Sequence, residues 1–296
     1  MTEPILRIEG LRVAIGRGAR ATPILRGVDL AVAPGEVHGL VGESGAGKSM
    51  IGRAVLGLLP GGARITAGTV CYGGLDMAAI GPRGRQRLLG REIALVPQDP
   101  TAALNPVRRI GRQITDVLRL RLGLGRAEAA RRAVEILAET AIREPERVVQ
   151  QYPHELSGGM RQRVLIGIAF AGRPRLIVAD EPTTALDVTA QREILRLIRQ
   201  LQGRYGSAVL FVTHDLGVVA KICQRVTVLH AGRVVEEGDI ARILQAPRHA
   251  YTGALLAAMP RVDRPGHRPA PIPAALTDRL WAEAHAFDAA ATAGAA

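Results

Sequence analysis

Residues 42–49 of this 296-residue chain read GESGAGKS, which matches the spacing G-x-x-x-x-G-K-[ST]. Glycines in such a loop let the backbone N–H groups turn inward toward an anion. Lys48 can then neutralise outer phosphates, and the hydroxyl of Ser49 can ligate Mg²⁺. Only Lys48 and Lys221 are lysines among the 39 basic residues, which suggests that this position needs a compact ammonium. The motif predicts phosphate binding, and a glycine-rich helix entry that binds nothing is the weaker alternative.

Two carboxylates, Asp180 and Glu181, directly follow the apolar run 176–179. A buried strand that delivers carboxylates at its C-terminal edge is typical of ligand sites in α/β folds. In phosphoryl-transfer enzymes such an aspartate holds Mg²⁺, and Glu181 is a candidate to polarise an attacking water. The alternative is that both acids cap a neighbouring helix.

Two further polar residues and one serine–glycine stretch have weaker signals when each is taken alone. Gln98 and His214 each follow a predicted strand and could reach a metal ion, a water or a phosphate. A loop glutamine usually has no chemical role, however, and a strand-end histidine is more often structural. Ser157, Gly158 and Gly159 precede a predicted helix, where the serine suits an N-cap. The same three residues could form a second anion-binding helix start, which hints at a nucleotide contact made across a dimer.

Short apolar runs and stretches of helical spacing alternate along the chain around these motifs. Residues 4–15 indicate a strand pair broken at Gly10. Further strands are expected at 24–32, 37–41, 69–72, 93–96, 176–179, 208–212, 225–229 and 233–236. Helices are expected at 50–58, 83–92, 110–122, 126–141, 160–171, 188–201, 216–222, 240–245 and 251–257. The alternation predicts an α/β fold in which the motifs lie at strand ends.

The chain changes character twice. Residues 85–172 are predominantly helical, and we assign them to a helical subdomain between the two halves of a nucleotide-binding core with a β subdomain, 1–84 and 173–260. After residue 260, four prolines lie within 264–273 and alanine dominates 286–296. We therefore expect residues 261–296 to form a C-terminal extension, an extended linker followed by a weakly helical or partly disordered end.

Composition excludes several classes of protein. Apolar residues make up 47% of the chain and charged residues 22%, as in soluble globular proteins. No run approaches the roughly 20 apolar residues that span a bilayer, and the start MTEPILRIEG lacks a secretory signal. Two distant cysteines favour a cytosolic protein without disulfides. The net charge of +12 is spread along the chain and decides little, while an aromatic content of only 3% argues against a single-strand nucleic-acid binder.

With the phosphate loop, LSGGM at 156–160, VADEP at 178–182 and His214 in this order, residues 5–260 resemble the ATP-binding cassette (ABC) ATPases. The resemblance implies a P-loop NTPase ABC cassette with a RecA-like core, an antiparallel β subdomain and a helical subdomain. It implies catalytic roles for Glu181 as general base and for His214, Gln98 and Lys48. It implies Mg²⁺ ligation by Ser49, Gln98 and Asp180. The implied nucleotide contacts are Gly42, Glu43, Ser44, Gly45, Ala46, Gly47, Lys48, Ser49, Met50, Ser157, Gly158, Gly159 and Asp187.

Three stretches are similar to the ATPases of oligopeptide, dipeptide and nickel importers: VPQDPTAALNP at 96–106, ADEPTTALDVTAQREIL at 179–195 and APRHAYTGALLAAMP at 246–260. This narrower resemblance implies an ATPase that uses ATP and Mg²⁺ to power uptake of peptides, nickel or similar solutes. It implies a second ABC ATPase subunit, identical or paralogous, and two transmembrane permease subunits. An extracytoplasmic solute-binding protein would act indirectly, no nucleic acid is involved, and the chain would lie peripherally on the cytoplasmic face of the inner membrane.

Two other functions stay open at this point. One is the ATPase component of a soluble enzyme assembly, because the carbon–phosphorus lyase accessory cassettes also resemble this family. The other is a nucleic-acid cassette, although such chains carry long coiled coils or two fused cassettes. The residue that stacks on adenine is also open, since the family often has an aromatic near Ile15 and this chain has only aliphatic residues there.

Overall fold

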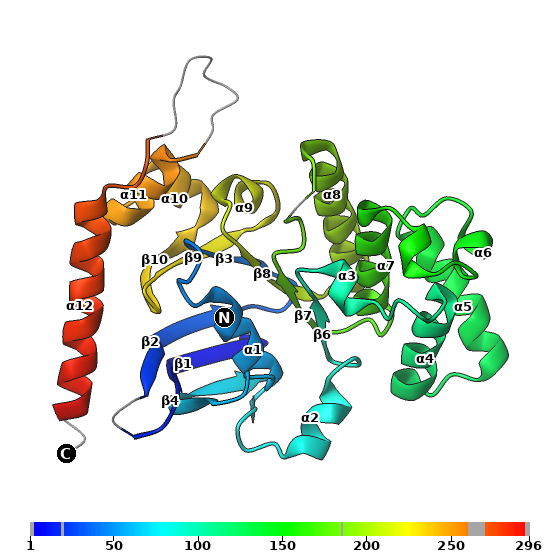
Figure 1. Ribbon diagram of the computed structural model, residues 1–296, viewed down its shortest axis with the longest axis horizontal. Helices are drawn as coiled ribbons and strands as arrows, with labels where there is room; N and C mark the ends of the chain where they lie inside the picture. Colours follow the sequence, from blue (N-terminus) through cyan, green and yellow to red (C-terminus); the bar gives the residue numbers. More distant parts are fainter. Residues whose placement is uncertain (1–2, 19–20, 185, 260–269, 294–296) are drawn as a thin grey trace. The chain divides into compact units, whose positions relative to one another are not determined.

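A computed structural model describes residues 3–18, 21–184, 186–259 and 270–293. The chain forms two compact units, unit 1 from Met1–Ile80 and Leu210–Ala296, and unit 2 from Gly81–Val209 (Figure 1). The structure thus groups residues 173–209 with the helical segments, whereas the sequence placed them with the core. The reason is that strand β7 (Leu176–Asp180) pairs with β6 (Ile93–Val96), and helix α8 (Val188–Tyr205) packs on α7 (Gly158–Phe170).

Unit 1 contains an antiparallel sheet in the order β2-β1-β4-β5. Its strands are β1 (Leu6–Ile15), β2 (Thr22–Val32), β4 (Ala63–Tyr72) and β5 (Leu75–Asp76). The predicted break at Gly10 is wrong, because β1 is one strand with a bulge between Ile8 and Leu11. Gly10 adopts a positive φ of 56° there, and its N–H donates to the side chain of Asp29 at 2.7 Å. A glycine therefore bends this strand without ending it.

Unit 1 also holds strands in the order β10-β9-β3-β8, with β3 parallel to β9 and β9 antiparallel to β10. They are β3 (Val37–Val41), β8 (Ala208–Thr213, from Leu210 on in this unit), β9 (Arg225–His230) and β10 (Arg233–Asp239). Every residue of β3 is buried, as its mostly apolar sequence predicts, and the one polar side chain, His38, is hydrogen-bonded to Thr227 Oγ1 at 2.8 Å. The shorter helices of the unit are α1 (Lys48–Leu56), α9 (Leu216–Ile222), α10 (Ile240–Gln245) and α11 (Ala250–Ala257).

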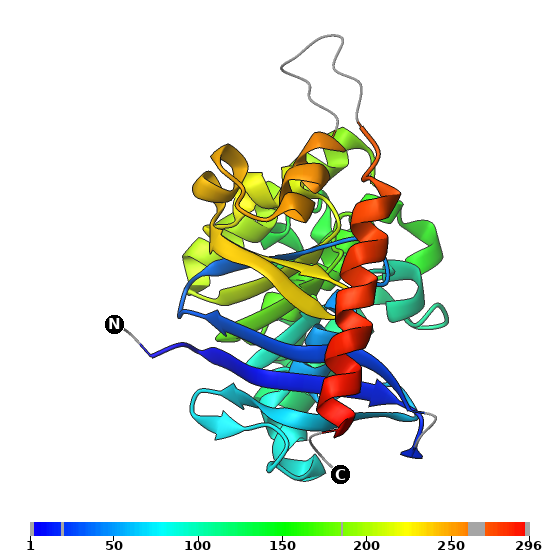
Figure 2. The same ribbon diagram turned by 90° about the vertical axis from the view of Figure 1, so that its left-hand side faces the viewer.

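The end of the described chain is a 20-residue helix, α12 (Ala274–Ala293), where the sequence suggested only weak helicity or disorder. Leu280 and Ala284, four residues apart, are buried on one face. The Phe287 ring packs under two guanidinium groups, with ring-centroid distances of 4.6 Å to Arg12 and 4.7 Å to Arg233. Figure 2 shows α12 lying across the strands that carry these arginines. Tertiary contacts therefore order a helix that its alanine-rich sequence does not specify alone. Most of the proline-rich segment lies outside the described residues.

Unit 2 contains the parallel strand pair β6–β7 and a helical bundle. The helices of the bundle are green in Figure 1. Its other helices are α2 (Pro82–Leu88), α3 (Pro100–Ala103), α4 (Ile110–Leu122), α5 (Arg126–Glu139) and α6 (Pro145–Val148). Buried side chains of α4, α5 and α7 form one hydrophobic core, including Ile114, Leu118, Ile136, Leu137 and Val164. No helix in the described part of the chain is long and apolar enough to cross a membrane.

Helix α4 offers a matched pair of leucines for a stability test, since the side chain of Leu118 is fully buried and Leu120 is 80% exposed. We expect Leu118→Ala to lower the free energy of unfolding by about 2–5 kcal/mol, because it removes buried methylenes and leaves a cavity. The same change at Leu120 should stay within about 0.5 kcal/mol of the parent. Urea unfolding of both variants measures the difference, and equal losses would contradict the packing described.

Candidate nucleotide site

The phosphate loop of unit 1 joins buried strand β3 to helix α1, as its motif predicted. Gly47 is the N-cap of α1 and has φ 101°, a conformation that side-chain-bearing residues rarely adopt. The N–H groups of Met50 and Ile51 donate to the Gly47 carbonyl at 3.0 and 3.2 Å, so the helix begins directly at the loop. The start of a helix presents unpaired N–H groups and the positive end of its dipole, both suited to an anion.

Gly42 opens the loop in a place where only glycine fits. A Cβ there would lie 2.1 Å from the carbonyl oxygen of Leu229 in β9. The N–H of Gly232, in the turn after β9, donates to the Ala46 carbonyl at 3.0 Å. The loop is thus packed on the β9–β10 turn at both of its ends, while Ser44 and Gly45 between them are exposed.

Lys48 is 5% exposed and its Nζ lies within the loop. It donates to the carbonyls of Gly42 at 2.8 Å and Glu43 at 2.9 Å. This ammonium is therefore held among the backbone groups that would surround a phosphate, which agrees with the role expected from the sequence. Ser49 and Met50 follow on the first turn of α1.

His214, the remaining candidate in unit 1, is exposed directly after β8. The next residue, Asp215, caps α9 by accepting from the N–H of Gly217 at 2.7 Å and of Val218 at 3.3 Å. The cap fixes the backbone beside His214 and leaves the imidazole at the strand end, as the sequence predicted.

Unit 2 brings Gln98 and Glu181 together. Val96 pairs with Ala179 in the parallel register, so residues two positions further along the two strands emerge side by side. Gln98 Nε2 donates to Glu181 Oε2 at 3.4 Å, and Thr184 Oγ1 donates to the same oxygen at 2.7 Å. Asp180 is the last residue of β7. The carboxylates are therefore delivered at strand ends, as predicted.

Glu181 also has a positive φ of 46°, unusual for a residue with a side chain. Such a conformation costs of order 1 kcal/mol and persists where surrounding contacts enforce it, often at functional sites. Its carboxylate is held by Thr184, a contact that sequence reasoning missed. A hydroxyl three residues after the acid was the available signal.

Ser157 is the N-cap of α7, and its Oγ accepts from the N–H of Met160 at 3.3 Å. A Cβ built at Gly158 or Gly159 would meet no atom within 4 Å among the described residues. Neither glycine has a positive φ, so the packing of this chain alone does not require them. Asp187 is the N-cap of α8 and accepts from the N–H groups of Thr189 and Ala190, each at 2.9 Å.

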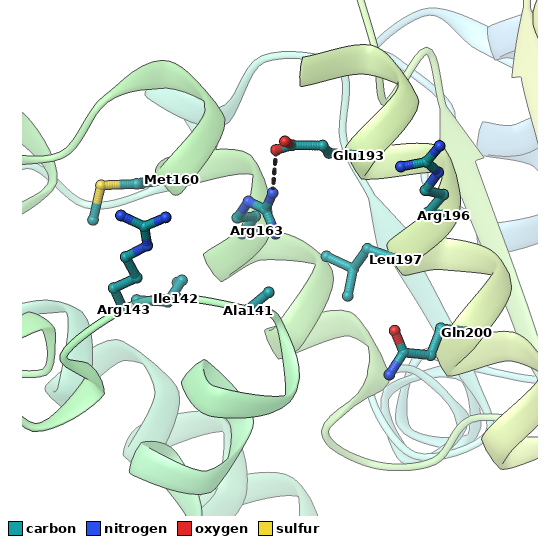
Figure 3. A pocket seen from close by; sticks show the side chains of 9 residues that line it. All are labelled: Ala141, Ile142, Arg143, Met160, Arg163, Glu193, Arg196, Leu197 and Gln200. Atoms are coloured by element: carbon teal, nitrogen blue, oxygen red, sulfur yellow. Dashed lines mark hydrogen bonds and ion pairs between the residues drawn. The ribbon is translucent and has the colours of Figure 1, made fainter. Parts of the chain in front are cut away.

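A separate hollow of about 590 Å³ lies beside α7 and α8 (Figure 3). Arg143, Arg163 and Arg196 line it, and Arg163 is paired with Glu193 at 2.7 Å. None of the candidate catalytic or nucleotide-binding residues lines this hollow. It is a basic surface of unit 2 distinct from the carboxylates at the strand ends.

Two further residues near the loop were not predicted from the sequence. They are Tyr251, within the stretch 246–260, and His230, which lies beside it in space. Tyr251 is fully buried, and its hydroxyl lies 3.1 Å from a carboxylate oxygen of Glu43 in the phosphate loop. Burial raises the pKa of Tyr251, and burial lowers the pKa of His230. A tyrosine in the first turn of a predicted helix was the local signal available for this contact.

Comparison with known proteins finds two family models that match this chain. Residues 25–184 match the family model described as ABC transporter, and residues 235–280 match the oligopeptide/dipeptide transporter, C-terminal region. The dipeptide transport ATP-binding protein DppD of Escherichia coli is 40% identical over 269 residues, which cover 91% of this chain and 82% of that protein.

Two other relatives extend the comparison. The oligopeptide transport ATP-binding protein OppD of Bacillus subtilis is 42% identical over 88% of this chain and 74% of its own length. The peptidoglycan transport ATP-binding protein YejF of Agrobacterium fabrum is 44% identical over 89% of this chain. The chain spans only 48% of the length of that last relative.

Among solved structures, the dimeric ATP-binding cassette MJ0796 in a post-hydrolysis state bound to ADP and Pi is similar, with a TM-score of 0.71 and 27% sequence identity. The match covers 79% of this chain and 98% of the cassette. The predicted P-loop ABC-cassette fold is therefore confirmed. This chain belongs to the ATP-binding subunits of the ABC transporter family, in the group that carries the oligopeptide/dipeptide transporter C-terminal region.

Proposed function

We propose that the chain is the ATP-hydrolysing subunit of an ABC importer for peptides or similar small solutes. The observation that carries the proposal is the presence of both matched regions, 25–184 and 235–280, in a single chain. Relatives that match most of this chain are described as peptide, oligopeptide or dipeptide ATP-binding proteins. A role in a soluble enzyme assembly has no comparable support.

ATP would bind with its phosphates at the loop Gly42–Ser49, where Lys48 supplies the positive charge. Ser49, Gln98 and Asp180 offer hydroxyl, amide and carboxylate oxygens, the hard donors that Mg²⁺ prefers, and we assign the metal to them. Bound Mg²⁺ would neutralise charge on the phosphates. Residues 1–84 and 173–260 remain our prediction for the nucleotide-binding core.

Glu181 would act as the general base, because its carboxylate can accept a proton from the attacking water. Hydrogen bonds from Gln98 and Thr184 both reach one oxygen, Oε2, and so orient the carboxylate. His214 would donate to the oxygens of the transferred phosphoryl group, and Lys48 would stabilise the charge that develops there.

The start of α7 supports the use of a second cassette. Gly158 and Gly159 leave open space beside unpaired helix N–H groups, and this chain does not fill that space with its own described residues. We propose that the loop Ser157–Gly159 and Asp187 contact ATP held by a second ABC subunit, identical or paralogous. Two permease subunits would carry the solute, delivered by an extracytoplasmic binding protein, with this chain peripheral on the cytoplasmic face of the membrane.

Glu181→Gln tests the base assignment. The amide cannot take the proton of the water, so we expect hydrolysis to fall by at least about a hundredfold. ATP affinity should stay near that of the parent protein. Phosphate release and nucleotide titration measure the two effects. Glu146→Gln, an exposed carboxylate in α6, is the control and should hydrolyse ATP at the parental rate. Parental hydrolysis by Glu181→Gln would remove the assignment.

Gly158→Asp tests the contact with a second cassette. A carboxylate at a helix start stabilises the helix by about 0.3–1 kcal/mol, so the melting temperature should not fall. The same charge would repel a phosphate, so hydrolysis should drop more than about tenfold. The ATP-induced dimer of Glu181→Gln, seen by light scattering, should also be lost in the double variant.

Gly125→Asp is the matched control for this experiment, because Gly125 is the N-cap of α5 and likewise has open space around it. That variant should keep parental hydrolysis and the ATP-induced dimer. If both aspartate variants hydrolysed ATP equally well, the start of α7 would have no role in the site.

The importer assignment is tested by isolating the chain from membranes and identifying the bound subunits. We expect two permease subunits to be recovered with it. Uptake of a labelled dipeptide or oligopeptide by cells should be lost with Glu181→Gln and restored by the parent gene. Recovery only in a soluble complex, with unchanged peptide uptake, would refute the transport function.

A further inference from the structure

Glu43 of the phosphate loop contacts helix α11 near the C-terminal end of the chain. The hydroxyl of Tyr251, in α11, donates to Glu43 Oε2 at 3.1 Å. The backbone N–H of Glu43 donates back to Tyr251 Oη at 3.3 Å. Both the side chain and the main chain of this loop residue are therefore tied to one phenol.

Tyr251 is itself fixed by a series of hydrogen bonds that leads back to β10. The carboxylate of Glu236 accepts the N–H groups of Arg248 at 2.9 Å and His249 at 3.1 Å. His249 Nδ1 then accepts the N–H of Tyr251 at 3.1 Å and caps α11. The phenol consequently reaches the loop from a helix whose first turn cannot shift freely.

His230 packs against the Tyr251 ring, with centroids 4.5 Å apart and an interplanar angle of 58°. It is 5% exposed, and neither ring nitrogen has a hydrogen-bond partner among the described residues. The imidazole packs on the phenol ring, and its Nδ1 also lies 3.7 Å from Glu43 Oε2, the oxygen to which Tyr251 donates. Trp281 of α12 also lies near His230, with ring centroids 6.0 Å apart in an edge-to-face arrangement.

The position of Glu43 explains why this contact bears on nucleotide binding. Its N–H is held by Tyr251, and its carbonyl accepts the Lys48 ammonium at 2.9 Å. A shift of Glu43 would therefore move both the loop backbone and the lysine that faces the phosphates. The next two residues, Ser44 and Gly45, are exposed, so burial does not hold this part of the loop.

We propose that Tyr251 is a positioning residue that fixes the phosphate loop in its binding conformation. Through it, the C-terminal region of these subunits acts directly on the nucleotide site. The effect on ATP affinity rests on the proposed function, whereas the effect on loop mobility does not. A tyrosine that only filled the core would stabilise unit 1 without a specific effect on the loop.

The test compares Tyr251→Phe with Tyr205→Phe in the full-length chain. Tyr205 is the matched control, because its hydroxyl also donates to a carboxylate, that of Glu139 at 2.7 Å, but within unit 2. We expect Tyr251→Phe to weaken ATP binding by about three- to tenfold, the loss of one or two hydrogen bonds. Amide hydrogen exchange in peptides covering residues 42–47 should accelerate without nucleotide. Tyr205→Phe should change neither quantity.

Unchanged exchange in the phosphate loop of Tyr251→Phe, or equal acceleration in Tyr205→Phe, would overturn the proposal. If the parent protein failed to bind ATP, the proposed function would be refuted. The hydrogen-exchange result would still test whether Tyr251 holds the phosphate loop. If Tyr251→Phe does not fold, Glu43→Ala is the alternative variant. It removes the carboxylate that accepts from Tyr251, and the side chain of Glu43 is half-exposed. It should accelerate exchange in the same peptides, and parental exchange would again refute the role of Tyr251.

Discussion

Close packing of the phosphate loop on the β9–β10 turn is the constraint on which the rest of unit 1 depends. Gly42 has no room for a Cβ against the Leu229 carbonyl, and Gly232 donates to the Ala46 carbonyl at 3.0 Å. Gly232 is itself required, since a Cβ there would lie 2.0 Å from the Ile24 carbonyl oxygen. Three segments distant in sequence therefore meet through backbone atoms, which cannot yield as side chains can.

The backbone also determines the positions of the carboxylates in unit 2. The parallel register of β6 and β7 sets Gln98 beside Glu181 without any direct link along the chain. Glu181 adopts a left-handed backbone conformation, which turns its carboxylate toward Thr184. A strained residue held by two hydrogen bonds is more rigid than an acid on a regular strand end, and rigidity favours a group that must orient a water.

Helix α12 continues beyond the matched family region, which ends at residue 280, and it has a structural role there. Arg26 is buried, donates to Asp288 at 2.8 Å and to the Ala231 carbonyl at 2.7 Å, and so ties α12 to the turn that supports the phosphate loop. The guanidinium groups of Arg12 and Arg233 both contact the Phe287 ring. Guanidinium groups suit this task because they stack on aromatic rings and donate in fixed directions. The arginine bias of the composition thus has a visible use in unit 1.

The sequence alone determined the order of nearly all strands and helices, because apolar periodicity and glycine positions are local signals. It also determined the candidate site residues, since GESGAGKS, LSGGM and VADEP carry their chemistry in short spacings. Only the tertiary structure decided that Gly10 bends one strand, that α12 is an ordered helix, and that Tyr251 contacts Glu43 some 208 positions earlier. Each of these depends on a neighbour distant in sequence, and local residue patterns contain no information about that neighbour.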